Sequence, residues 1–217
     1  MPLMALFVLD HTLNFPPVHM AEPDGLLAVG GDLSEERLLL AYRNGIFPWY
    51  EGEHILWWCP HPRFVVTPQE IKISKSMRSL LNKNAFTFTI NTAFEAVINN
   101  CKTISRPGQD STWITNDVKK AYINLHKKGW AHSAEVWSNN ELVGGLYGIR
   151  MGRVFFGESM FSKQSNASKY AFIKYTQYLQ TQHVQLIDCQ VYTEHLESMG
   201  AKMIDRTRFI NLLNELM

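Results

Sequence analysis

The sequence predicts an α+β protein in which a small N-terminal domain packs on a larger domain, whose mixed sheet is layered by helices. Residues 1 to about 62 are rich in proline, glycine and aromatic residues, and the composition becomes ordinary after that point. Three consecutive strand patterns within 132–158 predict an antiparallel meander, and helix and strand patterns then alternate toward the C-terminus. We therefore expect a small α/β domain at 1–62 and the main domain at 63–217.

Turn signals dominate the N-terminal part, which also contains one well-marked helix. The segments 14–17, 22–25 and 30–32 combine proline, glycine, asparagine and aspartate in a way that is typical of turns. Ser34 is suited to cap the N-terminus of a helix, and Gly45 is suited to the position just past its end. A helix between these two residues is therefore predicted.

Three tryptophans, Trp49, Trp57 and Trp58, lie within ten residues of one another and beside prolines. Aromatic clusters of this kind usually form a core or a domain interface, because each ring buries a large apolar surface. The alternative is a stacking platform for a nucleic-acid base, since every base offers a face to an aromatic ring. The sequence leaves both interpretations open.

The main domain shows a regular succession of elements. Strands are predicted at 64–66, 86–90, 132–137, 141–150, 153–158, 185–191 and around Met203. Helices are predicted from Ser74, at 92–101, 116–128 and 166–182, before Gly200 and at the C-terminus. Thr92 and Glu95 have the spacing of a capping box, and Thr207 is predicted to cap the last helix.

Composition excludes several classes of protein. The 217 residues are 46% hydrophobic and 19% charged, so the chain can bury a core. Its formal net charge of +1 provides no global basic field, so any contact with nucleic acid must be local. The widely spaced Cys59, Cys101 and Cys189 argue against a zinc site or a disulfide framework and are typical of a reducing cytosol.

The start of the chain does not resemble a targeting segment. It lacks a basic region and reaches Asp10 and His11 too soon for a signal peptide. No apolar run approaches the roughly 20 residues that a membrane span needs. We expect a soluble, cytoplasmic protein.

Two strand-like segments carry polar side chains that a reaction could use, Phe-Phe-Gly-Glu-Ser-Met-Phe at 155–161 and Leu-Ile-Asp-Cys-Gln at 186–190. A carboxylate such as Glu158 is costly to desolvate among apolar neighbours, so it either has a function or emerges into water at the end of the strand. Asp188 and Gln190 are two residues apart, which places both on one side of a strand and turns Cys189 toward the core on the other.

The element order of the main domain resembles that of GNAT acyltransferases. That fold binds the pyrophosphate of coenzyme A on a glycine-rich loop after its central strand. The corresponding segment here, 159–166, contains no glycine. The resemblance therefore implies a GNAT-like C-terminal domain and does not extend to coenzyme A.

Five strings of residues, read in order, make the resemblance more specific. They are 23–33 (Pro-Asp-Gly-Leu-Leu-Ala-Val-Gly-Gly-Asp-Leu), 45–49 (Gly-Ile-Phe-Pro-Trp), 57–58 (Trp-Trp), 157–161 (Gly-Glu-Ser-Met-Phe) and 186–190. Together they resemble the leucyl/phenylalanyl-tRNA–protein transferase family from about residue 13 to the C-terminus. The resemblance implies transfer of Leu or Phe, less often Met, from aminoacyl-tRNA to proteins that begin with Arg or Lys, which marks them for N-end-rule degradation. No metal or coenzyme is expected.

The resemblance also implies roles for individual residues. Asp188 would polarise the side-chain amide of Gln190, whose oxygen would draw a proton from the attacking amine, and Glu158 would hold the α-amino group of the donor. Trp49 and Trp113 would hold the terminal adenine of the tRNA. Lys75, Arg78 and Lys83 would face the acceptor stem; as a basic helix face, they are otherwise solvated surface. The pocket for the transferred side chain would be lined by Leu146, Phe155, Met160, Phe172, Tyr175 and Ile187.

Two other functions remain open from the sequence. One is another aminoacyl-tRNA-dependent acyltransferase with the same fold, although no membrane-facing helix for a lipid-linked acceptor is evident. The other is a non-catalytic RNA-binding module, which would tolerate changes at Asp188 and Gln190.

Overall fold

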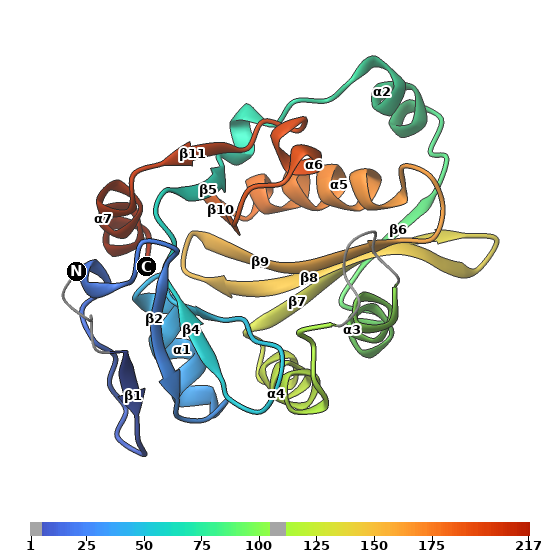
Figure 1. The fold of residues 1–217 in the computed structure, drawn as a ribbon. Coiled ribbons are helices and arrows are strands. Elements are labelled where there is room, and N and C mark those ends of the chain that lie inside the picture. Colours follow the sequence, from blue (N-terminus) through green and yellow to red (C-terminus); the bar gives the residue numbers. More distant parts are fainter. Residues whose placement is uncertain (1–5, 105–111) are drawn as a thin grey trace.

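The computed structural model describes residues 6–104 and 112–217, which form two β-sheets with helices packed against them (Figure 1). The smaller sheet has the strand order β1-β2-β4-β3, and the larger has the order β11-β5-β10-β9-β8-β7-β6. Residues 1–5, which belong to the start that we interpreted as lacking a signal peptide, lie outside the described part. The predicted α+β architecture, with a small N-terminal sheet and a larger mixed sheet, is confirmed.

The N-terminal part of the chain forms the smaller sheet. Its elements are β1 (Phe7–Leu9), a short turn of helix (Val18–Met20), β2 (Leu26–Gly30), α1 (Glu35–Arg43), β3 (Phe47–Pro48) and β4 (Leu56–Trp58). Ser34 caps α1 as predicted, because its Oγ accepts a hydrogen bond from the backbone N–H of Arg37 at 3.4 Å. Gly45 follows the helix with a φ of 71°, a left-handed conformation that glycine adopts without strain.

The remainder of the chain forms the larger sheet and its helices. The strands are β5 (Arg63–Val66), β6 (Thr87–Ile90), β7 (Ala131–Ser138), β8 (Glu141–Met151), β9 (Val154–Ser162), β10 (Leu186–Gln190) and β11 (Lys202–Ile204). The helices are α2 (Lys75–Asn82), α3 (Phe94–Thr103), α4 (Asn116–Lys127), α5 (Ala167–Thr181), α6 (Glu194–Glu197) and α7 (Arg206–Leu216), with a helical turn at Pro68–Glu70. In Figure 1, α5 lies on one side of this sheet and α3 and α4 lie on the other.

Two predicted caps are wrong, although both helices exist. Helix α3 begins after Ala93, and Thr92 instead donates its hydroxyl hydrogen to Glu135 Oε2 at 3.1 Å. The other oxygen of Glu135 lies 3.5 Å from the Ala93 nitrogen and accepts its hydrogen bond, so a carboxylate from β7 serves this helix end. Helix α7 is capped by Asp205, which accepts from the backbone N–H of Thr207 at 2.7 Å. In each case a carboxylate, rather than the predicted threonine, accepts a backbone N–H at the start of the helix.

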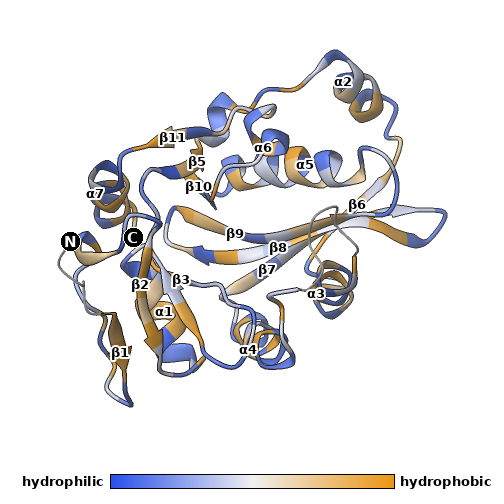
Figure 2. Cartoon of the chain, viewed as in Figure 1, coloured by the Kyte–Doolittle hydropathy of each residue, from blue (hydrophilic) through white to orange (hydrophobic). Residues whose placement is uncertain are grey.

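Two apolar clusters fill the two sides of the large sheet. One contains residues of α3, α4 and α7 and continues into the small sheet and α1, so the small sheet packs on the main domain through a shared core. The other lies between the sheet and α2 and α5. Helices such as α4 and α5 carry both hydrophobic and hydrophilic residues, as expected when only one side faces a sheet (Figure 2). Within the described ranges, no helix has the length and apolar character needed to span a membrane.

The two parallel strands at the centre of the sheet separate after a short pairing. β10 pairs with β9 only between residues 186–188 and 154–156. β9 then continues to Ser162, four residues beyond the predicted end, and stays paired with β8. The backbones of β9 and β10 are therefore not paired with each other after Phe156 and Asp188, and an opening lies between the two strands.

Candidate active site

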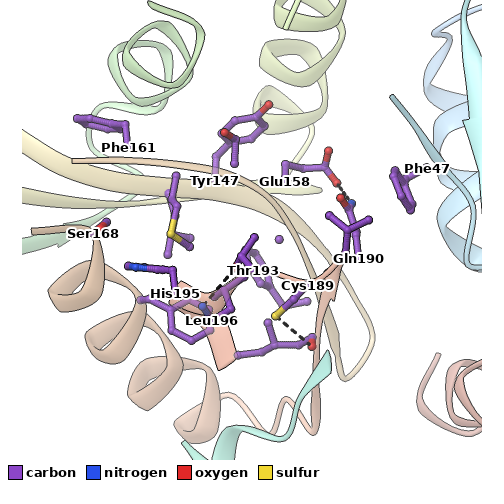
Figure 3. A pocket seen from close by; sticks show the side chains of 18 of the residues that line it. Phe47, Tyr147, Glu158, Phe161, Ser168, Cys189, Gln190, Thr193, His195 and Leu196 are labelled. Atoms are coloured by element: carbon purple, nitrogen blue, oxygen red, sulfur yellow. Dashed lines mark hydrogen bonds between the residues drawn. The ribbon is translucent and has the colours of Figure 1, made fainter. Parts of the chain in front are cut away.

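A cavity of about 570 Å³ occupies this gap (Figure 3). Its walls come from β3, β8, β9, the start of α5, the end of β10 and the segment that contains α6. Both polar segments predicted from the sequence therefore border one space. The space exists because β9 and β10 diverge, so that neither backbone occupies the region between them.

Glu158 is directed into the site by an irregularity in β9. Gly157 pairs with Gly148 and Ser159 pairs with Tyr147, which leaves Glu158 as an extra residue between two regular pairs. A β-bulge of this type bends the strand and changes the direction of the side chain that it carries. Gly148 is needed opposite the bulge, because a Cβ at this position would lie 2.1 Å from the carbonyl oxygen of Phe156.

Replacing Gly148 by alanine is expected to destabilise the protein by roughly 3 kcal/mol, because backbone atoms that cannot move away cause the clash. Thermal or denaturant unfolding followed by circular dichroism measures this effect. Gly157→Ala is the matched control, since its Cβ would meet only the Asp188 carbonyl oxygen at an ordinary 3.5 Å. Equal stabilities for the two variants would contradict the role assigned to Gly148.

The carboxylate of Glu158 is surrounded by neutral hydrogen-bond donors. Tyr42 donates to Oε1 at 2.7 Å, Tyr122 donates to Oε2 at 3.0 Å, and Gln190 Nε2 donates to Oε1 at 3.0 Å. The two tyrosine hydroxyls also contact each other. Among the described residues, no lysine or arginine forms an ion pair with Glu158. Burial raises the pKa of Glu158 to about 7, and the hydrogen bonds from Tyr42 and Tyr122 partly oppose this rise.

Asp188 has a different environment and carries a full counter-ion. Arg63 binds it through two guanidinium nitrogens, with Nε donating to Oδ1 at 2.8 Å and Nη2 donating to Oδ2 at 2.6 Å. Both side chains are fully buried. Oδ1 also accepts the backbone N–H of Gln190 at 2.9 Å. Gln190 itself has a φ of 65°, and the pairing of β10 with β5 shifts register between Asp188 and Gln190.

This arrangement corrects the expected contact between Asp188 and Gln190. The carboxylate binds the backbone of Gln190, and the side-chain amide of Gln190 binds Glu158 instead. Figure 3 shows Gln190 and Glu158 directed toward each other. The difference arises because the left-handed residue and the register shift interrupt the regular alternation of the strand. Cys189, expected to face away into the core, packs beside the cluster under α5 and also lines the cavity.

The apolar residues named from the sequence are brought together with one exception. Five of the six line the cavity, namely Leu146, Phe155, Met160, Phe172 and Ile187. Tyr175 does not line it; its ring packs edge-on against Phe155, with centroids 5.0 Å apart. Tyr175 therefore packs behind Phe155, and its hydroxyl group is not part of the cavity lining.

Of the residues expected to contact tRNA, the two tryptophans line the cavity and the three basic residues do not. Trp49 and Trp113 both line the cavity, Trp49 partly exposed and Trp113 buried. Lys75 and Arg78 lie on α2 and Lys83 lies at its C-terminus, all three exposed and none lining the cavity. The structure therefore places the tryptophans at the site and the basic residues on a separate surface near one end of α5 (Figure 1).

Comparisons with known proteins agree with the strings found in the sequence. A family model described as leucyl/phenylalanyl-tRNA protein transferase matches residues 65–214, and a model of the N-terminal domain of this transferase matches residues 31–61. A transferase of the same name from Flavobacterium johnsoniae is 56% identical over 209 residues, which are 96% of this chain and 99% of the relative. One from Syntrophobacter fumaroxidans is 56% identical over 213 residues, 98% of this chain and 91% of the relative.

The chain belongs to the leucyl/phenylalanyl-tRNA–protein transferase family. The family predicted from the sequence is therefore confirmed. The protein is an aminoacyltransferase, with aminoacyl-tRNA as donor and a protein as acceptor.

Sequence reasoning missed three residues of this transferase's site. Tyr42 and Tyr122 come from α1 and α4, which were predicted from the sequence only as helices, with no role for either tyrosine. In the sequence, Arg63 stood out only as the first residue of the main domain. The one available signal was a charged residue directly before the apolar run 64–66, and it does not reveal the partner, Asp188, 125 positions away.

Proposed function

We propose that this transferase moves Leu or Phe, less often Met, from aminoacyl-tRNA to the α-amino group of proteins that begin with Arg or Lys. The modified proteins would then be degraded by the N-end rule in the cytoplasm. The observation that carries this proposal is the cavity between β9 and β10. It combines an apolar wall with the Glu158 carboxylate, as an apolar aminoacyl group with a free amine requires.

The two parts of the donor have suitable partners in the cavity. The wall formed by Phe155, Phe172 and Ile187 offers an apolar environment for a leucyl or phenylalanyl side chain. Glu158 is an acceptor that the α-amino group of the donor can use, since its present partners are all neutral. Trp49 lies at the same cavity and is partly exposed, so its ring is open to stacking with the terminal adenine beside Trp113.

The aminoacyl ester is already activated, so the enzyme needs to orient an amine against the carbonyl. As the C–N bond forms and the ester C–O bond breaks, the proton lost by the amine is returned to the departing ribose oxygen of the tRNA. We assign to Gln190 the hydrogen bond that orients the attacking amine. Its Nε2 is held by Glu158, which leaves its carbonyl oxygen free to accept from the attacking amine. Asp188 contributes by holding the backbone of Gln190, rather than by a contact with its amide.

Two further parts of the proposal concern the chain as a whole. The basic residues Lys75, Arg78 and Lys83 remain the predicted contact with the acceptor stem, which their exposure permits. We also retain 1–62 and 63–217 as the domains, supported by the change of sheet between β4 and β5.

We expect the transferase to prefer Leu and Phe over Ile and Val. The latter two branch at Cβ, next to the carbonyl under attack, and we expect the walls from Phe155 and Ile187 to accommodate this branch least well. Met160, also in the lining, can adapt to different side chains. Discrimination by single methyl groups amounts to about 10–200-fold, so some transfer of Ile should be measurable. A competition among tRNAs charged with these four amino acids, with one Arg-starting peptide as acceptor, measures the ratios. Equal transfer of Ile and Leu would show that these residues do not form the pocket.

The same assay separates the other functions. Binding of Phe-tRNA without transfer to the peptide would indicate an RNA-binding module. Transfer to an acceptor other than an N-terminal Arg or Lys would indicate a different aminoacyl-tRNA-dependent acyltransferase.

A further inference from the structure

The reaction described above assigns no role to Arg63. Its guanidinium is fully buried between the rings of Phe47 and Phe209, 4.8 and 4.6 Å from their centroids. Besides its two bonds to Asp188, it donates from Nη1 to the carbonyl oxygen of Gly45 at 3.0 Å. One side chain therefore contacts the N-terminal domain, α7 and β10 at once.

A fully buried ion pair is weak evidence for stability, since desolvation offsets much of the attraction. Burial alone would lower the pKa of Arg63, but the Asp188 carboxylate outweighs this effect and raises the pKa above its ordinary value. The guanidinium therefore stays charged. Its two parallel hydrogen bonds fix the plane of the carboxylate, whereas a single hydrogen bond would leave the carboxylate free to rotate.

The fixed carboxylate determines the conformation of the next polar residue. With Arg63 on both oxygens, Asp188 Oδ1 still accepts the backbone N–H of Gln190 at 2.9 Å. Gln190 has a left-handed backbone, which side chains other than glycine, asparagine and aspartate rarely adopt unless their surroundings hold them there. This conformation places the Gln190 amide 3.0 Å from Glu158, at the cavity.

Arg63 also contacts a second segment that lines the cavity. Gly45 and Phe47 lie four and two residues before Trp49, and Phe47, Pro48 and Trp49 all line the cavity. The contacts of Arg63 with Gly45 and Phe47 hold this segment to the same carboxylate that holds Gln190. Arg63 therefore contacts both the segment that carries Trp49 and the carboxylate that holds Gln190.

We propose that Arg63 is a positioning residue for aminoacyl transfer, which acts through Asp188 to hold Gln190 in its left-handed conformation. This inference rests on the proposed function, because it assumes that Gln190 contacts the attacking amine. Displacement of a reacting group by about 1 Å can reduce a rate by up to about 10²-fold. Loss of the bidentate contact should therefore lower kcat more than it raises KM.

The test is Arg63→Lys, which keeps the charge and loses the bidentate contact. We expect kcat for transfer from Phe-tRNA to an Arg-starting peptide to fall about 10–100-fold, while KM for Phe-tRNA changes less than about 3-fold. Arg37→Lys is the matched control. Arg37 is also fully buried and binds the backbone carbonyls of Asp10 and Thr12, but it does not line the cavity. This control should lose stability and keep its kcat.

Both variants are assayed at a temperature well below their measured Tm, so that only folded protein is compared. A normal kcat in Arg63→Lys, or an equal loss in Arg37→Lys, would overturn the inference. If wild-type protein transfers nothing to the peptide, the proposed function fails instead, and the two failures are distinguishable.

Should Arg63→Lys not fold, the wild-type protein supplies a second measurement. A backbone N–H bonded to a buried carboxylate is protected from exchange with solvent and resonates downfield in the amide NMR spectrum. We expect both properties for Gln190. Rapid exchange at an ordinary chemical shift would show that Asp188 does not hold this residue and would overturn the inference.

Discussion

Replacing Asp188 by asparagine is expected to lower kcat by on the order of 10²–10⁴-fold, the usual contribution of assisted proton transfer. The change leaves the buried Arg63 without a counter-ion and removes one of the two oxygens that bind it. The backbone of Gln190 then loses its fixed acceptor, so the amide no longer stays aligned at the cavity. Binding of aminoacyl-tRNA should change little, because Asp188 does not line the cavity.

The same substitution should also destabilise the fold by about 3–5 kcal/mol, the typical effect of removing one partner of a buried ion pair. Single-turnover transfer, measured below the Tm of the variant, separates this loss from the catalytic one. Asp205→Asn is the matched control, since this exposed aspartate caps α7 and lies outside the cavity. A variant with Asn at 188 that is folded and turns over at a near-normal rate would contradict the assignment.

Replacing Glu158 by glutamine is expected to lower kcat/KM for aminoacyl-tRNA by roughly 10–10²-fold, because one hydrogen bond to a charged group contributes about 1.5–3 kcal/mol. The pH profile should change as well. The pKa of Glu158 is raised to about 7, so the wild-type carboxyl becomes ionised, and able to hold the amino group, as the pH rises through about 7. Wild-type kcat/KM should rise over that interval relative to the variant, whose residue 158 does not titrate.

Stability should show the opposite trend. The folded-state pKa of Glu158 lies above the ordinary value of 4.5, so the folded protein binds this proton more tightly than the unfolded chain does. Its contribution is present below pH 4.5 and is lost as the pH rises toward about 7, by at most about 3 kcal/mol. Unfolding curves of wild type and Glu158→Gln across this range measure the difference.

Glu135→Gln is the control for both pH experiments. Glu135 is fully buried and binds hydroxyl groups of Ser133 and Thr89, but it does not line the cavity. The Glu135→Gln variant should show the same rise of kcat/KM with pH as the wild-type protein. A wild-type profile identical to that of Glu158→Gln would show that residue 158 does not control transfer in this range.

Much of the fold follows from local patterns. The cap at Ser34 and the glycine at 45 define α1, because both act within one turn of helix. The meander and α5 lie where alternation and helical periodicity predict them, since each pattern needs only neighbouring residues. The caps at Thr92 and Thr207 were wrong because the two helices begin at other residues. Glu135, from another strand, accepts the N–H of Ala93 at the start of α3, and Asp205 caps α7 two residues before Thr207.

By itself, the sequence determined the family, the α+β class and the presence of Glu158, Asp188 and Gln190 in apolar strands. The connections among these residues were decided only by the tertiary structure. Two irregularities in strand pairing interrupt the alternation from which side-chain directions are inferred, and the side-chain amide of Gln190 therefore contacts Glu158 rather than the Asp188 side chain. Arg63 and Tyr42 reach their carboxylates from 125 and 116 positions away, so no local pattern records either contact. Such pairs form because a buried carboxylate needs hydrogen-bond donors, and the donors are those side chains that folding brings near it, whatever their distance along the sequence.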